Sequence, residues 1–270
     1  MRIGFVTDEI SPDLEEALRI GISWGVYDYE LRMIGEKRIP DIPEAQIEKI
    51  FKMKKEFGIR ITALSPGSFK CRVNDRTQVK RELAVTLPET LRLAQILGAQ
   101  IVLVFGFFKP KRPSFDQENK VVDIFRKVAG LAAQHNLIVA VENEPGFCCD
   151  SGENTARILR KVDSPYLRAN WDPANAVGAG APAFPQGYDS IKPWIANVHI
   201  KDTVQTTAIE CVPVGEGIVD WCGQLQALAR DKTVEHVTIE THCLPLLEKS
   251  QQNLMTVREI LKNVQIADHS

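Results

Sequence analysis

Short apolar runs alternate with longer stretches of helical periodicity from one end of the chain to the other. The short runs are rich in Val and Ile, which is typical of buried parallel strands when helical segments lie between them. We expect eight strands, over residues 2–6, 27–33, 59–64, 101–105, 138–141, 167–171, 195–200 and 236–239. This alternation predicts a single (β/α)8 TIM barrel, an α/β fold that takes ~250 residues.

Helix signals lie between the predicted strands. Ser11-Pro12-Asp13 predicts an N-cap with proline in the first turn, and Gly58 predicts the end of a helix that begins near Pro43. Pro88 should kink or divide its helix, because proline has no amide donor. Further helices are expected over residues 79–97, 115–134, 155–161, 188–194, 221–229 and 246–262. The Gly- and Pro-rich segment 178–187 is expected to be a strand-to-helix loop.

Composition narrows the class of protein. The 270 residues are 44% hydrophobic and 25% charged, and no linker composition interrupts them, so we expect one domain over residues 1–270. A net charge of −2 offers no positive field for a phosphate backbone, which argues against a nucleic-acid partner. We expect no membrane span and a cytoplasmic protein, because no apolar run reaches ~18 residues and the start lacks a signal peptide. The oligomeric state is not readable.

The six cysteines show no CxxC pair and no disulfide-scaffold density, so they are interpreted as reduced thiols. Cys148 and Cys149 lie close to the candidate site in sequence. Ordinary packing is the favoured interpretation for both, and a reactive thiol is the alternative.

Four potential metal ligands follow or end predicted strands: Glu142, Asp172, His199 and Glu240. The carboxyl ends of barrel strands meet at one mouth, so these side chains should converge although they are far apart in the chain. Side chains alternate along a strand, which turns Glu240 toward the barrel axis when Ile239 faces the helices. The repeated placement favours one shared site over four separate solvated charges or ion pairs.

A buried group of carboxylates needs compensation, because removing each one from water costs several kcal/mol. One divalent metal ion is the simplest compensation. Three carboxylates and one imidazole suit Mn²⁺ or Mg²⁺ best, and such a set of ligands could also bind Co²⁺ or Zn²⁺.

Other polar residues near the predicted mouth each have two interpretations. Asn175 could bind a substrate hydroxyl or orient a metal ligand, and it could equally be a turn residue. Lys201 could bind an anionic substrate group or pair with Asp202. Both are substrate-binding candidates.

Four further positions are weaker candidates. Glu144 is a reserve acid or base, with an ion pair at the rim as the alternative. Glu30 and Arg32 could line the mouth, and an ordinary ion pair is the favoured interpretation. His242 could join the pocket, since it shares strand parity with Glu240, and a position in a loop or behind the ligands is favoured.

Five motifs together resemble the sugar-phosphate isomerase/epimerase family of xylose-isomerase-like TIM barrels. They are Val141-Glu142-Asn143-Glu144, Asn170-Trp171-Asp172-Pro173-Ala174-Asn175, Val198-His199-Ile200-Lys201-Asp202, Gly215-Glu216-Gly217-Ile218-Val219-Asp220 and Ile239-Glu240. The resemblance implies that Glu142, Asp172, His199 and Glu240 bind a metal ion. It also implies that Glu142 and Glu240 are the catalytic acid/base pair.

The chain departs from the D-tagatose 3-epimerase-like members at three positions. Cys148 stands where they have a carboxylate, Asn175 where they have histidine, and Gln205 where they have arginine. These differences weigh against a free ketose as substrate and leave the predicted metal ligands intact.

The predicted chemistry is proton abstraction beside a carbonyl, with a metal-stabilised enediolate, by an isomerase or epimerase of a sugar, sugar phosphate or related polyol. An inosose-dehydratase-like lyase, a hydroxypyruvate-isomerase-like enzyme and a noncatalytic sugar-binding barrel are the alternatives. An apurinic-site endonuclease is disfavoured, because its trinuclear zinc cluster needs several histidines and only His199 is placed at the site.

Overall fold

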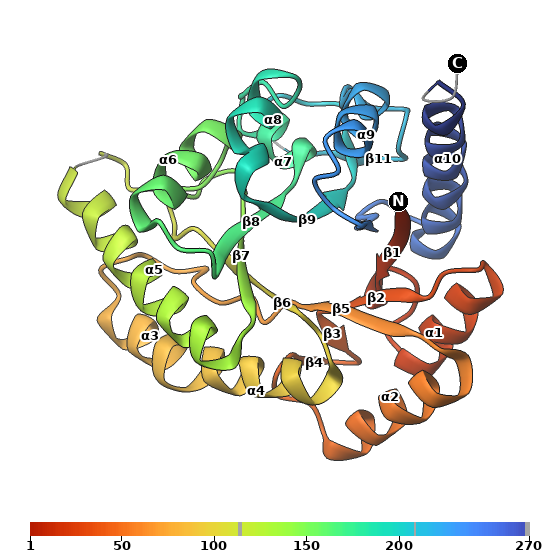
Figure 1. Cartoon of the computed structure of the whole chain (residues 1–270), viewed down its shortest axis with the longest axis horizontal. Helices are drawn as coiled ribbons and strands as arrows, with labels where there is room; N and C mark the ends of the chain where they lie inside the picture. Colours follow the sequence, from red (N-terminus) through yellow and green to blue (C-terminus); the bar gives the residue numbers. More distant parts are fainter. Residues whose placement is uncertain (113–114, 208, 268–270) are drawn as a thin grey trace.

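The strands close into a parallel barrel with the order β1-β12-β9-β8-β7-β6-β5-β2 (Figure 1). The computed structural model describes residues 1–112, 115–207 and 209–267, with side chains described up to residue 264. The barrel strands are β1 (Arg2–Val6), β2 (Asp28–Leu31), β5 (Arg60–Leu64), β6 (Ile101–Phe105), β7 (Ile138–Glu142), β8 (Leu167–Trp171), β9 (Ile195–Ile200) and β12 (His236–Ile239). The predicted (β/α)8 TIM barrel is confirmed.

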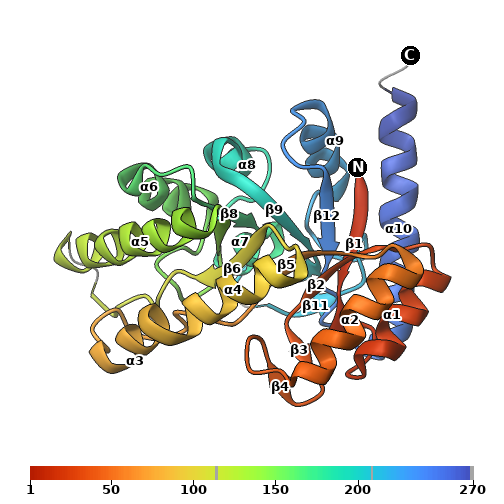
Figure 2. The ribbon, with the colours of Figure 1, turned by 60° about the horizontal axis from the view of Figure 1, so that its bottom comes forward.

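Helices surround the barrel, as Figures 1 and 2 show from two directions. They are α1 (Leu14–Ser23), α2 (Glu44–Phe57), α3 (Arg76–Arg81), α4 (Leu87–Leu97), α5 (Phe115–His135), α6 (Gly152–Val162), α7 (Pro173–Gly178), α8 (Gln186–Ile191), α9 (Trp221–Arg230) and α10 (Leu246–Ala267). Each predicted helix therefore has a counterpart, with shifted ends in several cases.

Three local predictions need correction or refinement. The N-cap of α1 is Asp13, whose carboxylate accepts a bond from the Glu16 amide at 2.9 Å, so Ser11 as N-cap was wrong. The helix around Pro88 is divided as predicted: a π-helical segment, Glu82–Thr86, separates α3 from α4, and Pro88 lies in the first turn of α4. The loop expected over 178–187 is shorter, because α7 ends at Gly178 and α8 begins at Gln186.

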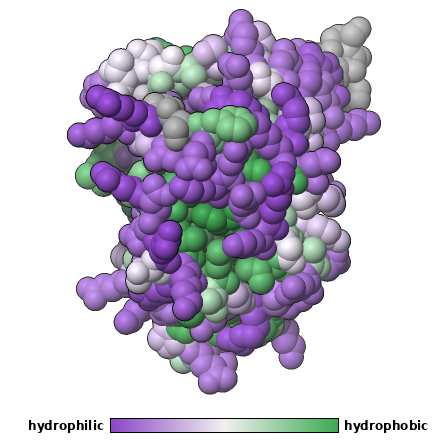
Figure 3. Space-filling model, turned by 90° about the vertical axis from the view of Figure 1, so that its left-hand side faces the viewer, coloured by the Kyte–Doolittle hydropathy of each residue, from purple (hydrophilic) through white to green (hydrophobic). Residues whose placement is uncertain are grey.

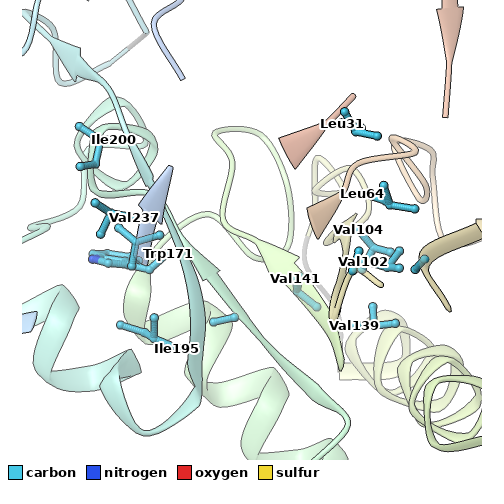
Figure 4. Close-up of a cluster of buried hydrophobic side chains, with 14 of the residues drawn as sticks. Leu31, Leu64, Val102, Val104, Val139, Val141, Trp171, Ile195, Ile200 and Val237 are labelled. Carbon is cyan, nitrogen blue, oxygen red and sulfur yellow. The ribbon is translucent and has the colours of Figure 1, made fainter. Parts of the chain in front are cut away.

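The two faces of the strands carry different side chains. Outward-facing residues such as Val102, Val104, Val139 and Val141 pack in the large core between strands and helices (Figure 4). The alternate residues of the same strands, Ile101, Leu103 and Ala140, form a small inner cluster with Ala63. Glu142 follows Ala140 at an interval of two residues, so the alternation turns its side chain into the barrel.

Two hairpins that were not predicted extend from the strand ends. One joins β3 (Met33–Ile34) to β4 (Lys37–Arg38) after β2, and the other joins β10 (Asp202–Thr203) to β11 (Cys211–Val212) after β9. Figure 2 shows the β3–β4 hairpin beyond the barrel strands at the bottom of the view. The first hairpin adds residues to the mouth of the barrel.

Hydrophilic residues cover most of the side that faces the viewer in Figure 3, around a hydrophobic area near the centre. Across the described ranges, none of the helices combines the length and the apolarity that a membrane crossing requires.

Candidate metal centre

The structure brings together the four residues that the sequence singles out. Ligand atoms from Glu142, Asp172, His199 and Glu240 all lie within 4.8 Å of one another. All four side chains are buried, with relative exposures of 5% or less. Four polar groups gathered this closely inside a barrel form a candidate site for one cation.

Each of these residues is positioned by the end of a strand. Glu142 is the last residue of β7, His199 lies within β9, and Glu240 follows β12 directly. Asp172 follows β8 and caps α7, because its Oδ1 accepts a bond from the Asn175 amide at 2.8 Å. One carboxylate oxygen of Asp172 is thus occupied by the helix, and Oδ2 is left for the site.

A buried carboxylate orients the imidazole of His199. Its Nε2 lies 2.9 Å from Glu30 Oε2, and both side chains are 1% exposed. A carboxylate is an acceptor only, so Nε2 carries the proton and the lone pair of the neutral ring is on Nδ1. Nδ1 lies 3.4 Å from Glu240 Oε2 and 3.7 Å from Glu142 Oε1, facing the other candidate ligands.

The electrostatics of His199 also reflect its acidic surroundings. Burial opposes a charge on the ring, but Glu30, Glu240 and Glu142 outweigh burial and raise the pKa of His199 well above its usual value. Without a metal ion, the imidazole therefore retains a proton that a metal would displace.

Glu240 is held by cations on both carboxylate oxygens. Lys201 Nζ lies 2.9 Å from Oε2, and Arg32 Nη1 lies 2.7 Å from Oε1, where His242 Nε2 is also close at 3.0 Å. Burial raises its pKa, yet Lys201, His242 and His199 together hold the pKa of Glu240 well below the usual value. Glu240 is the strongest acid of the group.

Glu142 has fewer charged partners than Glu240. Its Oε1 accepts a bond from Asn175 Nδ2 at 3.2 Å, and no arginine or lysine side chain of the described residues forms an ion pair with it. Burial raises its pKa, and His199 then holds it below the usual value. Asp172 differs, because burial outweighs its partner Lys201 and raises the pKa of Asp172.

The two substrate-binding candidates both lie at the site. Asn175 joins Glu142 to the backbone through a second bond from Nδ2 to the Asn143 carbonyl at 2.8 Å. Lys201 lies 2.8 Å from Asp172 Oδ2 as well as 2.9 Å from Glu240, and it does not pair with Asp202. The Asp202 carboxylate instead accepts backbone bonds from the 215–219 turn.

The expected Glu30–Arg32 ion pair was wrong. Glu30 turns inward to His199, and Arg32 binds Asp8, Glu9 and Glu240. These two residues are the main ones that sequence reasoning placed incorrectly. The β2 alternation of Asp28, Glu30 and Arg32 was the signal that could have turned them toward the axis.

The donor set fits a divalent ion. His199 Nδ1 is buried and, among the described residues, has no hydrogen-bond partner. Three buried carboxylates surround it, and Lys201 is the cation shared between two of them. A second group of potential ligands, Glu9, Glu240 and His242, shares only Glu240 with the first and includes an exposed histidine.

A cavity of about 460 Å³ opens onto this group. Its lining includes Glu142, Asn175, Lys201 and Glu240 from the barrel, together with Arg38 and Lys70 from the surrounding loops. Glu144 also lines it and pairs with Lys70 at 2.9 Å, which agrees with the rim ion pair expected as one alternative.

Two of the positions that depart from the epimerase pattern lie elsewhere. Cys148 lines cavities outside this one, near α5 and α6, and Gln205 is exposed and bonds Glu210. Burial raises the pKa of Cys149 well above its usual value and keeps it a thiol, which agrees with a packing role.

Comparisons with known proteins agree with this fold. Residues 18–263 match the family of the xylose isomerase-like TIM barrel. The chain belongs to that family. The match spans most of the barrel and all four candidate ligands.

Individual relatives are more distant. A 3-dehydroshikimate dehydratase of Bacillus anthracis is 30% identical over 89 residues, which are 33% of this chain and 31% of that protein's length.

The crystal structure of a probable 3-DHS dehydratase from Bacillus anthracis superposes with a TM-score of 0.77 at 20% identity, covering 95% of this chain and 99% of that one. The IolI protein with a bound zinc atom superposes with a TM-score of 0.79 at 17% sequence identity, with 98% of each chain covered. A D-tagatose 3-epimerase-like protein superposes with a TM-score of 0.81 at 15% sequence identity, with 99% of each chain covered.

Proposed function

We propose that this protein is a divalent-metal-dependent enzyme that moves a proton on a carbon beside a carbonyl, and that it isomerises or epimerises a sugar, sugar phosphate or related polyol. The observation that carries the proposal is the group of four buried ligand atoms within 4.8 Å of one another. The zinc atom named for the IolI neighbour and the epimerase neighbours support it. The donor set of three carboxylates and one imidazole favours Mn²⁺ or Mg²⁺, and we propose a cytoplasmic location.

A divalent ion bound by these four residues would supply positive charge beside the substrate oxygens. Glu30 would hold the His199 ring with Nδ1 toward that ion. Asn175 and Lys201 would fix the carboxylates of Glu142, Asp172 and Glu240 in place.

The two catalytic glutamates have unequal surroundings. Glu240 is paired with Lys201 and Arg32, and its pKa is well below the usual value, so it is a weak base. Glu142 has only an amide and an imidazole beside it. We therefore assign to Glu142 both the removal of the proton from carbon and its return, and to the ionised Glu240 the orientation of the substrate on the other side.

A dehydratase is the second candidate. It is favoured by the 30% identity to a 3-dehydroshikimate dehydratase and by the structural likeness to a probable 3-DHS dehydratase. Such an enzyme would begin with the same proton removal and then expel a hydroxyl group, so the two candidates share Glu142 and differ in the product.

The test is solvent exchange. The Mn²⁺-loaded protein is incubated in D₂O with ketoses, ketose phosphates, inososes, hydroxypyruvate and 3-dehydroshikimate, and mass spectrometry follows deuterium uptake and loss of water. Deuterium in a recovered isomer supports the isomerase, and water loss supports the dehydratase. Ligands that bind without any exchange, or exchange that survives in Glu142→Gln, would contradict the assignment.

A further inference from the structure

The cavity over the metal centre contains one arginine that is not neutralised. Arg38 lies on the β3–β4 hairpin and lines the cavity together with Glu142, Lys201 and Glu240. Among the described residues its guanidinium donates one hydrogen bond, from Nη1 to the Ser65 carbonyl oxygen at 3.3 Å. Within residues 1–112, 115–207 and 209–264, no carboxylate forms an ion pair with this guanidinium.

The other cations of the cavity are already paired. Arg32 contacts three carboxylates, those of Asp8, Glu9 and Glu240, and Lys201 contacts two. Lys70 pairs with Glu144 at 2.9 Å, and its ammonium lies 3.8 Å from the centre of the Phe105 ring. Arg38 is therefore the cation of this cavity whose charge is available to a ligand.

The local backbone makes room for Arg38. Gly67 has a φ of +77°, and a Cβ there would lie 3.0 Å from Arg38 Nη1 and 3.4 Å from its Cδ. Glycine at this position meets both requirements, the left-handed backbone and the passage of the guanidinium. Burial and the neighbouring Arg32 lower the pKa of Arg38 and outweigh the opposing effect of Asp8 and Glu240, neither of which forms an ion pair with it.

We propose that Arg38 binds the carboxylate of the substrate, and that the substrate is a polyhydroxylated acid. The end of the substrate opposite the carboxylate faces Glu142 and Glu240. This inference rests on the proposed function for the orientation of the substrate. A guanidinium binds a carboxylate through two parallel hydrogen bonds, and the cavity of about 460 Å³ is of the size that holds a small metabolite.

A carboxylate fits this position better than a phosphate group. A phosphate dianion is usually bound by several donors, such as a helix N-terminus or a group of cations. Here, among the described residues, one guanidinium of the cavity has no ion pair, and the other cations, Arg32, Lys70 and Lys201, are each paired with carboxylates. One negative charge on the ligand matches one free positive charge on the protein.

The experiment compares ligands that differ only in the charged group. Calorimetry measures binding of D-gluconate against D-glucitol, shikimate against methyl shikimate, and D-fructose 6-phosphate against D-fructose, to metal-free and to Mn²⁺-loaded protein. We expect each hydroxy acid to bind about 10-fold or more tightly than its neutral counterpart. Arg38→Gln should abolish this preference, and Arg38→Lys should retain part of it, because lysine keeps the charge without the paired donors.

Arg92→Gln is the matched control, since Arg92 is exposed on α4 outside the cavity and should leave every affinity unchanged. Equal affinities within each acid pair, a preference that survives Arg38→Gln, or an Arg38-dependent preference for the phosphate alone would overturn the proposal.

Calorimetric Mn²⁺ binding, measured separately, is expected to be equal in wild type and Arg38→Gln. Its absence from the wild type would refute the proposed function, whereas the acid preference of metal-free protein would still decide the role of Arg38.

Discussion

The two ends of the barrel hold cavities of nearly equal volume that differ in how the buried carboxylates near them are paired. The cavity at the amino ends of the strands is about 470 Å³ and is lined by residues such as Arg2, Arg60 and His236. The cavity at the carboxyl ends is about 460 Å³ and is lined by two of the candidate metal ligands, Glu142 and Glu240. Volume does not separate the two ends, so the difference must be found in how their buried charges are paired.

At the amino end, one buried carboxylate has two arginines. Asp28 is 1% exposed, and its Oδ2 lies 2.7 Å from Arg2 Nε while its Oδ1 pairs with Arg60. At the carboxyl end, Lys201 pairs with Asp172 and Glu240, and Arg32 pairs with Glu240, while Glu142 has no lysine or arginine partner among the described residues. The first site is complete with protein groups alone, whereas the second has acidic groups to spare. We propose that a cation from solution completes the second site.

The largest expected effect is on metal affinity when one ligand is removed. Asp172→Asn keeps the cap of α7, because asparagine also caps helices well, and it removes one charge from the candidate centre. We expect Mn²⁺ affinity by calorimetry to fall more than the roughly 100-fold upper end typical for outer partners of a metal site. Affinity within tenfold of wild type would remove Asp172 from the ligand set.

The same substitution at the other end should have the opposite consequence. Asp28→Asn deprives two arginines of a buried partner, so the free energy of unfolding should fall by about 2 kcal/mol in urea titrations. Mn²⁺ affinity should remain that of the wild type. A weakened metal site with unchanged stability would reverse the contrast between the two ends.

Glu30→Gln tests the partner behind His199. Glutamine still accepts the Nε2 proton but lacks the charge, so we expect Mn²⁺ affinity to fall about tenfold, at the low end for such partners. Glu144→Gln is the control, because Glu144 pairs with Lys70 at the rim. Equal affinities in these two variants would show that Glu30 does not act through the imidazole.

The pH dependence of metal binding gives the smallest effect. His199 has a raised pKa without metal and must lose its proton to bind an ion, so affinity should rise with pH, by at most about tenfold per unit for one released proton. Calorimetry in buffers of different ionisation enthalpy should report this proton. In Glu30→Gln the rise should occur at lower pH, and an unchanged profile would contradict the assigned cause.

Much of this arrangement could be predicted from the sequence, because strand periodicity carries it. Short apolar runs between helical patterns predicted the eight strands, and side-chain alternation at two-residue intervals turned Glu142 and Glu240 toward the axis. Motif order suggested the fold family, which the match over residues 18–263 confirms. The roles assigned to the site residues are still predictions.

What could not be predicted depends on contacts between distant loops. Arg32 and Glu30 were expected to pair with each other, yet Arg32 binds Glu240 and Glu30 binds His199. Partner choice among charges depends on three-dimensional distance, which two-residue spacing does not encode. Arg38 reaches the cavity through a hairpin whose pattern, two short strands of two residues each, is too brief to detect.

The most direct test of the metal centre is anomalous diffraction from crystals soaked in Mn²⁺, collected on both sides of the manganese absorption edge. The account predicts a single peak per chain, within bonding distance of Glu142, Asp172, His199 Nδ1 and Glu240. Two results would contradict this prediction: a peak between Glu9, Glu240 and His242, the second group of potential ligands, or no peak at the barrel mouth in crystals soaked at a saturating concentration of Mn²⁺.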